Sequence, residues 1–191
     1  MRRGLAIAFV LAGLAAPAGW IVTDRLERDD DFCNACHLEP GLPLHEQVRR
    51  DYDARPPTTL AGAHGREGDF RCIDCHGGTS WLGRARVKLL AGKDAFWYLT
   101  GHFEEPDGMR WPLWDEDCAK CHESFAAQPA DQSWRAPRFH ELAVHNVELG
   151  VDCVSCHLVH DAGGSDESHF VHPDPVRQQC ARCHPEFEAT L

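Results

Sequence analysis

One short motif occurs five times in this chain and constrains its fold more than any other feature. It reads Cys-x-x-Cys-His and begins at Cys33, Cys72, Cys118, Cys153 and Cys180. Together the motifs use all ten cysteines of the 191-residue chain, so no cysteine is left for another purpose. Their starts are 39, 46, 35 and 27 residues apart, which is too irregular for a solenoid repeat.

Cys-x-x-Cys-His is the attachment signature of c-type haem. The two thiols bond covalently to the porphyrin, and the adjacent histidine is placed to ligate the iron. Zinc sites need no histidine directly after each cysteine pair, and disulfide scaffolds need no histidine at all. We therefore predict five covalently bound c-type haems. The attachment residues are Cys33, Cys36, Cys72, Cys75, Cys118, Cys121, Cys153, Cys156, Cys180 and Cys183.

Histidines are numerous enough to ligate each iron twice, as in most electron-transfer haems. The five proximal ligands would be the motif histidines, which are His37, His76, His122, His157 and His184. Eight of the 13 histidines then remain. The candidates for distal ligands among them are His64, His102, His140, His145, His160, His169 and His172, together with His45.

Few residues are available for each haem, and this decides the expected fold class. After the first 23 residues, 168 remain, and a chain that short cannot bury a large side-chain core around five haems. We expect a mainly α and irregular fold with little or no β-sheet, in which a compact multihaem cytochrome c domain has the haem stack as its core. The expected parts are 1–23 as an anchor, 24–130 with haems 1–3, and 131–191 with haems 4–5.

The N-terminus predicts a membrane anchor. Gly4–Val22 contains 19 residues without a charge, and as a helix it would span about 28 Å, close to the thickness of a bilayer. Arg2 and Arg3 precede it, and an acidic segment, 24–31, follows. By the positive-inside rule, a single-pass protein of the cytoplasmic membrane would have its haem domain on the periplasmic side. A cleavable signal peptide is the alternative, and it also places the haems outside the cytoplasm.

A segment after the second motif carries a family resemblance. It reads Lys88-Leu-Leu-Ala-Gly92, followed by Asp94 and then by Gly101-His102. With the anchor and the first motif just beyond it, this segment resembles the NapC/NirT/NrfH family of membrane-anchored quinol-oxidising cytochromes. The resemblance covers roughly residues 1–160 and four of the five motifs. The fifth motif extends beyond the four-haem pattern, as in some members of that family.

The resemblance implies a quinol site beside the first haem, within 24–130. Lys88 would donate a hydrogen bond to a quinol oxygen, and Asp94 would accept a proton or approach the first iron. On an ideal helix, residues six apart lie about 120° around the axis, so a straight helix would not direct both at one quinol. A bend at Gly92 would bring them together. Without the bend, both are solvated charges on an amphipathic helix.

The resemblance also implies ligands for three haems. His64 would cross over to the third haem, and His160 would return to the second. Many family members read Cys-x-x-Cys-His-x-Met at the first haem, where this chain has Glu39 in place of the methionine. The first iron is therefore ligated either by His37 or by another residue, with His45 as a candidate.

We therefore predict a membrane-anchored pentahaem cytochrome that takes electrons from a membrane quinol. It would pass them along its haems to a periplasmic reductase or cytochrome partner, with 4–22 in the lipid bilayer. A quinol dehydrogenase-type subunit fits better than a terminal reductase of a nitrogen or sulfur oxyanion, and an electron carrier without a quinol site is the other alternative. The formal net charge of -11 argues against nucleic acid as a partner.

Overall fold

The computed structural model describes residues 2–105, 113–122 and 151–190, and it describes side chains of the first helix only in that helix's C-terminal half. The chain is mainly helical with little sheet, which confirms the expected secondary structure. The helices are α1 (Arg2–Leu26), α2 (Asp30–Cys33), α3 (Glu46–Asp53), α4 (Leu60–Gly65), α5 (Cys72–His76), α6 (Trp81–Leu99), α7 (Asp115–Ala119) and α8 (Pro173–Ala181). The short 3-10 helices are η3 (Cys153–Ser155) and η4 (Pro185–Thr190), and the two antiparallel strands are β1 (His37–Glu39) and β2 (Leu42–Pro43).

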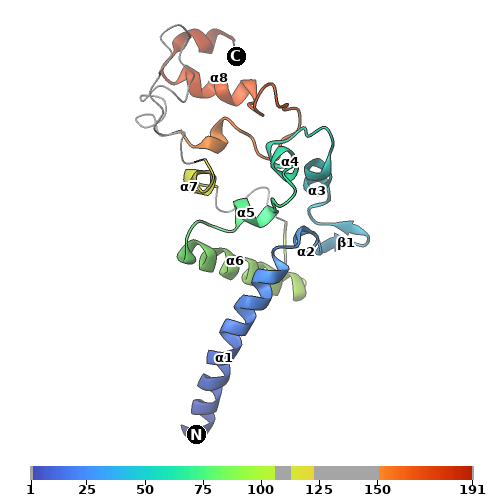
Figure 1. Cartoon of the computed structure of the whole chain (residues 1–191), viewed down its shortest axis with the longest axis vertical. Helices are drawn as coiled ribbons and strands as arrows, with labels where there is room; N and C mark the ends of the chain where they lie inside the picture. Colours follow the sequence, from blue (N-terminus) through green and yellow to red (C-terminus); the bar gives the residue numbers. More distant parts are fainter. Residues whose placement is uncertain (1, 106–112, 123–150, 191) are drawn as a thin grey trace.

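The first helix, α1, projects from one end of the molecule, while α8 lies at the opposite end (Figure 1). It has 25 residues and includes Pro17. Its many alanine and leucine residues favour a helix. Among the residues whose side chains the structure describes, which exclude most of the N-terminal half of α1, no helix combines the length and the apolar character needed to cross a membrane.

The long helix α6 lies across the C-terminal end of α1 (Figure 1). It begins after Ser80, whose hydroxyl caps it by accepting a hydrogen bond from the Gly83 amide at 3.1 Å. It then runs for 19 residues without a break. Gly92 lies inside this unbroken helix. The break that would bring Lys88 and Asp94 together is therefore not present.

The haem-binding motifs follow one another through the molecule in sequence order. The first cysteine of each motif lies in a short helical element, and each element contacts the next: α2 with α5, α5 with α7, α7 with η3, and η3 with α8. Figure 1 shows this succession running from the end of α1 to the end of the chain. The predicted attachment points therefore form a line that leads away from α1.

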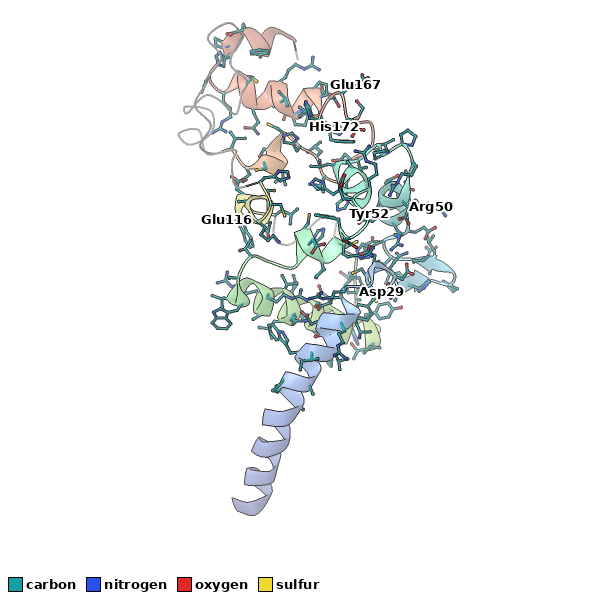
Figure 2. The ribbon with its side chains drawn as sticks, viewed as in Figure 1. Asp29, Arg50, Tyr52, Glu116, Glu167 and His172 are labelled. Carbon is teal, nitrogen blue, oxygen red and sulfur yellow. The ribbon has the colours of Figure 1, made fainter. Side chains whose placement is uncertain are left out.

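Buried apolar side chains are few among the described residues: Tyr52, Leu113 and Phe170. Tyr52 of α3 donates a hydrogen bond to the Phe70 carbonyl at 2.7 Å, and its ring lies against Gly65 of α4 (Figure 2). A Cβ at position 65 would lie 2.6 Å from that ring, so only glycine fits there. The small side-chain core agrees with the expectation from chain length, while the haem stack itself stays a prediction.

Candidate haem and quinol sites

Two aspartates join consecutive haem-binding motifs in the same way. Asp30, three residues before Cys33, accepts a hydrogen bond from the Cys72 amide at 2.9 Å. Asp115, three residues before Cys118, accepts one from the Cys153 amide at 2.8 Å. Each carboxylate therefore holds the first cysteine of the next motif close to the start of the motif that the aspartate precedes.

Two further contacts continue the line of motifs. Lys120 of the third motif donates a hydrogen bond to the Asp74 carbonyl of the second motif at 2.5 Å. The His172 amide, at the start of α8, donates to the carbonyl of Cys156 in the fourth motif at 3.4 Å. All ten cysteines lie in the described part of the chain, and none of them forms a disulfide there. The thiols are therefore available for thioether bonds.

The second motif brings two predicted ligands together. The rings of His76 and His160 are stacked with their centroids 6.0 Å apart. Burial, followed by the neighbouring His160, lowers the pKa of His76 to about 4, and burial also lowers the pKa of His160. Both rings are therefore neutral at pH 7, which is the form that ligates a metal.

The third motif shows a similar pair. His64 of α4 and His122 have ring centroids 6.1 Å apart, with the rings nearly perpendicular. The Nδ1 atom of His64 is hydrogen-bonded to the Leu60 carbonyl at 2.9 Å. Such a bond fixes the ring and leaves Nε2 available as the ligand, which is the usual arrangement at metal sites. A bidentate ion pair between Arg66 and Asp166 fastens the end of α4 to the loop before α8.

The C-terminal motifs have histidines nearby as well. His157 has its Nδ1 hydrogen-bonded to the His169 carbonyl at 3.0 Å, and His184 has its Nδ1 3.2 Å from a Glu186 oxygen. His172 directly precedes α8, and its Nε2 is buried without a hydrogen-bond partner in the described part of the chain (Figure 2). An orphaned ring nitrogen of this kind is suited to ligate a metal.

For the other predicted ligands, the described part of the chain shows no contact with a motif histidine ring comparable to those of His160 and His64. His45 directly precedes α3 and lies near enough to His76 and His160 to contribute to the lowered pKa values of both. His102 lies just beyond α6, with its ring 5.8 Å from that of Trp97. The predicted ligands His140 and His145 lie outside the described residues.

In the N-terminal half of α6, two of the three cationic side chains, Lys88 and Arg84, are bound to the C-terminal end of α1 and to Glu27 directly after it. Lys88 donates hydrogen bonds to Glu27 at 2.7 Å and to Thr23 at 2.9 Å, and its Nζ lies 5.0 Å from the centre of the Trp20 ring. Arg84 pairs with Glu27 as well, and it donates to Asp24 at 2.9 Å. That hydrogen bond is the main reason why the pKa of Asp24 lies below its usual value.

The C-terminal half of α6 borders an open hollow of about 290 Å³. Its lining includes a lysine, two carboxylates and two aromatic rings beside a histidine. These residues are Lys93, Asp94, Trp97, His102, Phe103 and Glu104. Asp94 was predicted for this site, whereas Lys88 does not line the hollow. The cation in the lining is instead Lys93, which is adjacent to Asp94 in the sequence.

Tyr98 connects this hollow to the first haem-binding motif. Its hydroxyl accepts a hydrogen bond from the His37 amide and donates one to the His37 carbonyl, both at 2.8 Å. The predicted proximal ligand of the first haem is therefore fixed to the same turn of α6 that carries Asp94 and Trp97. The sequence gives little sign of this bond, because Tyr98 and His37 are 61 residues apart.

Comparisons with known proteins agree with the presence of several haem-attachment motifs. The sequence model described as "NapC/NirT cytochrome c family, N-terminal region" matches residues 3–163. A curated relative, "Cytochrome c-type protein NapC" of Haemophilus influenzae, is 22% identical over 178 residues, which cover 82% of this chain and 80% of the relative. No solved structure matches the chain.

The family match spans most of the chain and includes four of the five motifs. Cysteines outside disulfides, followed by histidines that are neutral or oriented by carbonyl groups, fit covalently bound c-type haem. When bound, such haems accept and release single electrons. The chain is thus a multihaem electron-transfer protein and belongs to the NapC/NirT cytochrome c family.

Proposed function

We propose that this protein is a membrane-anchored pentahaem cytochrome that oxidises a membrane quinol and delivers the electrons to a periplasmic reductase or cytochrome partner. The observation that carries the proposal is the hollow beside α6, which contains Lys93 and Asp94 and is connected to His37 through Tyr98. A quinol bound there would lie next to the predicted first haem.

The proposed anchor is α1. The segment Gly4–Val22 is uncharged, and a helix of 25 residues is about 38 Å long, enough for a bilayer core. Figure 1 shows α1 extending away from the elements that carry the motifs. This direction suits a helix that leaves the haem domain at the membrane surface, with that domain on the periplasmic side.

The count of five haems is part of the proposal, because the family match ends at residue 163. Cys180, Cys183 and His184 supply a complete fifth motif, and α8 contacts η3 of the fourth. His172, with its orphaned Nε2, is the distal ligand that we propose for this end of the molecule. Mass spectrometry of the purified chain should show five covalently attached haem groups, and a mass with four would contradict the count.

The residues of the hollow have separate roles in the proposed reaction. Oxidation of one quinol to quinone releases two electrons and two protons. Trp97 and Phe103 offer apolar surface for the quinol ring, and Lys93 donates a hydrogen bond to one quinol oxygen. Asp94 accepts a proton from the quinol, and water takes the second proton through the open mouth of the hollow. A haem held by the first motif would accept the electrons one at a time.

Lys88 takes a different role in this proposal from the one that the family resemblance implies. Its ammonium group is bound to Glu27 and Thr23, and its side chain is only 10% exposed. We assign it the role of holding α6 against α1 so that the hollow stays in position. The same observation favours the second candidate function, an electron carrier that never binds quinol, because such a protein needs only this structural role.

Reduction of the haems by a quinol separates these functions. The purified protein in detergent is mixed with a reduced menaquinone analogue, and the haem absorption band is followed over time. We expect rapid reduction in the wild type, slow reduction in Asp94→Asn and Lys93→Ala, and a smaller effect in Lys88→Ala. No reduction in the wild type would leave the carrier function. Catalytic oxidation of the reduced protein by nitrite would instead indicate a terminal reductase.

A further inference from the structure

The face of α6 that points away from the haem-binding motifs is apolar and exposed. Its large side chains are spaced so that they lie on one side of the helix. We call this the outer face, and it consists of Trp81, Leu82, Leu89, Phe96 and Leu99. Leu89 is 76% exposed and Leu99 is 83% exposed, and with the other three side chains they form an exposed apolar surface of the kind that marks an interaction site.

The contacts of α6 establish where the outer face lies. Tyr98 holds one side of the helix to the first motif, and Arg84 and Lys88 hold a second side to α1. On an ideal helix the outer face begins next to Lys88 and is centred about 150° around the axis from Tyr98. Figure 1 shows the motif-bearing elements on one side of α6 and α1 extending on the other. The outer face is therefore directed to the side on which α1 leaves the domain.

An apolar surface on α1 adjoins this region. Ile21 and Val22, in the last turns of α1, are each more than half exposed. They lie next to Thr23, which is bound to Lys88 of α6. The exposed apolar surfaces of the two helices are thus neighbours, although they come from distant parts of the sequence.

The charge of α6 contrasts with that of the chain. The helix has four basic residues and one acidic residue, a net charge of +3 (4 − 1), in a chain of net charge -11. Arg84 and Lys88 are bound to α1, but Arg86 and Lys93 are exposed. On an ideal helix both project beside the outer face. An apolar face bordered by basic side chains is typical of helices that lie in a membrane interface.

We propose that the outer face of α6 lies in the headgroup region of a lipid bilayer, parallel to its surface. The inference rests on the anchor role of α1 in the proposed function. A second copy of the chain is the other possible occupant, but two such faces would bring Arg86 and Lys93 near the same residues of the partner. Anionic lipid headgroups pair with these charges instead.

This placement has a consequence for the hollow. Around the helix axis, Lys93 and Trp97 lie between the outer face and Asp94. With the outer face in the headgroups, the mouth of the hollow is level with the depth at which a quinol presents its ring. A quinol would then reach Asp94 past Lys93 without leaving the membrane.

Photocrosslinking tests the placement in the full-length, haem-loaded protein. The residue p-benzoylphenylalanine is introduced singly at Leu89, Leu99, Ile21 or Phe187, and each variant is placed in nanodiscs that contain phosphatidylglycerol. Phe187 is the matched control, because it is exposed and lies at the far end of the molecule in η4 (Figure 1). After illumination, mass spectrometry counts lipid adducts. At positions 89 and 99 we expect on the order of tenfold more lipid adduct than at 187.

Each result supports or overturns the proposal. Adducts at 21 together with background levels at 89 and 99 would overturn the interfacial placement and leave the anchor standing. Background levels at all four positions would overturn both the interfacial placement of α6 and the anchor role of α1. Crosslinked dimers at 89 in place of lipid adducts would assign the outer face to a second copy. Haem reduction by the menaquinone analogue, measured on the same samples, reports on the quinol site separately.

Discussion

The two halves of α6 use charged residues in different ways. In the N-terminal half, Lys88 and Arg84 both pair with Glu27, the residue directly after α1, and are largely removed from water. In the C-terminal half, Lys93 and Asp94 line a hollow that is open to solvent. One helix therefore combines a closed ion-pair cluster, made of Asp24, Glu27, Arg84 and Lys88, with an open polar site.

This contrast separates charged side chains that stabilise the fold from charged side chains that are available to react with a quinol. Lys88 has its hydrogen-bonding capacity directed at Glu27 and Thr23, so a quinol oxygen would have to displace one of them. Lys93 and Asp94 instead line the hollow, where a quinol can reach them through its open mouth. We therefore expect changes in the ion-pair cluster to alter stability first, and changes in the hollow to alter the reaction with quinol first.

The largest effect is expected from Asp94→Asn. Loss of the proton acceptor should slow haem reduction by the menaquinone analogue about 100-fold, the usual contribution of a general base. The amide keeps the size of the side chain, so thermal stability should change little. Asp174→Asn in α8 is the control, because its side chain is exposed and lies far from the hollow. Equal rates in the wild type and Asp94→Asn would contradict the proposed role.

For Lys88→Ala we expect the opposite: a clear loss of stability and a smaller effect on the rate of haem reduction. Removal of the ammonium group leaves Glu27 paired with Arg84 alone, in a place where the Lys88 side chain is only 10% exposed. We expect a loss of about 1–3 kcal/mol in stability, the range for a buried polar group that loses its partner. Unfolding followed by circular dichroism measures this loss.

Arg86→Ala is the matched control for that variant, since Arg86 is exposed on the same helix. It should change stability by no more than about 0.5 kcal/mol. If Lys88→Ala instead unfolds like the wild type but abolishes haem reduction, Lys88 would belong to the hollow's chemistry and the distinction between the two halves would fail.

A smaller effect is expected from Tyr98→Phe, which removes both hydrogen bonds to the backbone of His37. The expected loss is about 1–2 kcal/mol, together with a shifted reduction potential of one haem, because the first motif would lose its support. Tyr52→Phe is the matched control among the two tyrosines of the chain. Tyr52 bonds to the Phe70 carbonyl, so its loss should lower stability without changing that potential.

The features predictable from sequence were those that depend on neighbouring residues. The Cys-x-x-Cys-His motifs predict haem attachment from five consecutive positions, and the small number of residues per motif predicts a mainly helical chain with little sheet. Asp94 was selected from a local pattern as well, and it lines the hollow.

The remaining features depend on partners that are distant in the sequence. Lys88 and Glu27 are 61 residues apart, so the pattern around Lys88 shows a cation without its counter-ion. Asp30 and Cys72 are 42 residues apart, and the bond between them follows only once α2 and α5 have packed together. The position of Lys93 beside Asp94 could have suggested it as a site residue. That Lys93 lines the hollow follows only from the structure, in which α6 is one continuous helix.

The smallest effect concerns the acidic edge of the ion-pair cluster. The Arg84 hydrogen bond lowers the pKa of Asp24 below its usual 3.8 in the folded protein. The stability from this interaction is therefore complete above the unfolded pKa and is lost as the pH falls through the folded pKa. Solvent screens Asp24, whose side chain is 35% exposed, so the contribution is smaller than that of Lys88.

Unfolding of the wild type and of Asp24→Asn between about pH 2 and pH 7 measures this contribution. The wild type should be more stable by a constant amount near neutral pH, and the difference should shrink below pH 3.8 as Asp24 becomes protonated in the wild type. High salt should reduce the difference at neutral pH, because the pair is near the surface. A difference that is the same at every pH would mean that the negative charge of Asp24 does not stabilise the contact between α1 and α6. The electrostatic stabilisation by the cluster would then come from Glu27 with Arg84 and Lys88.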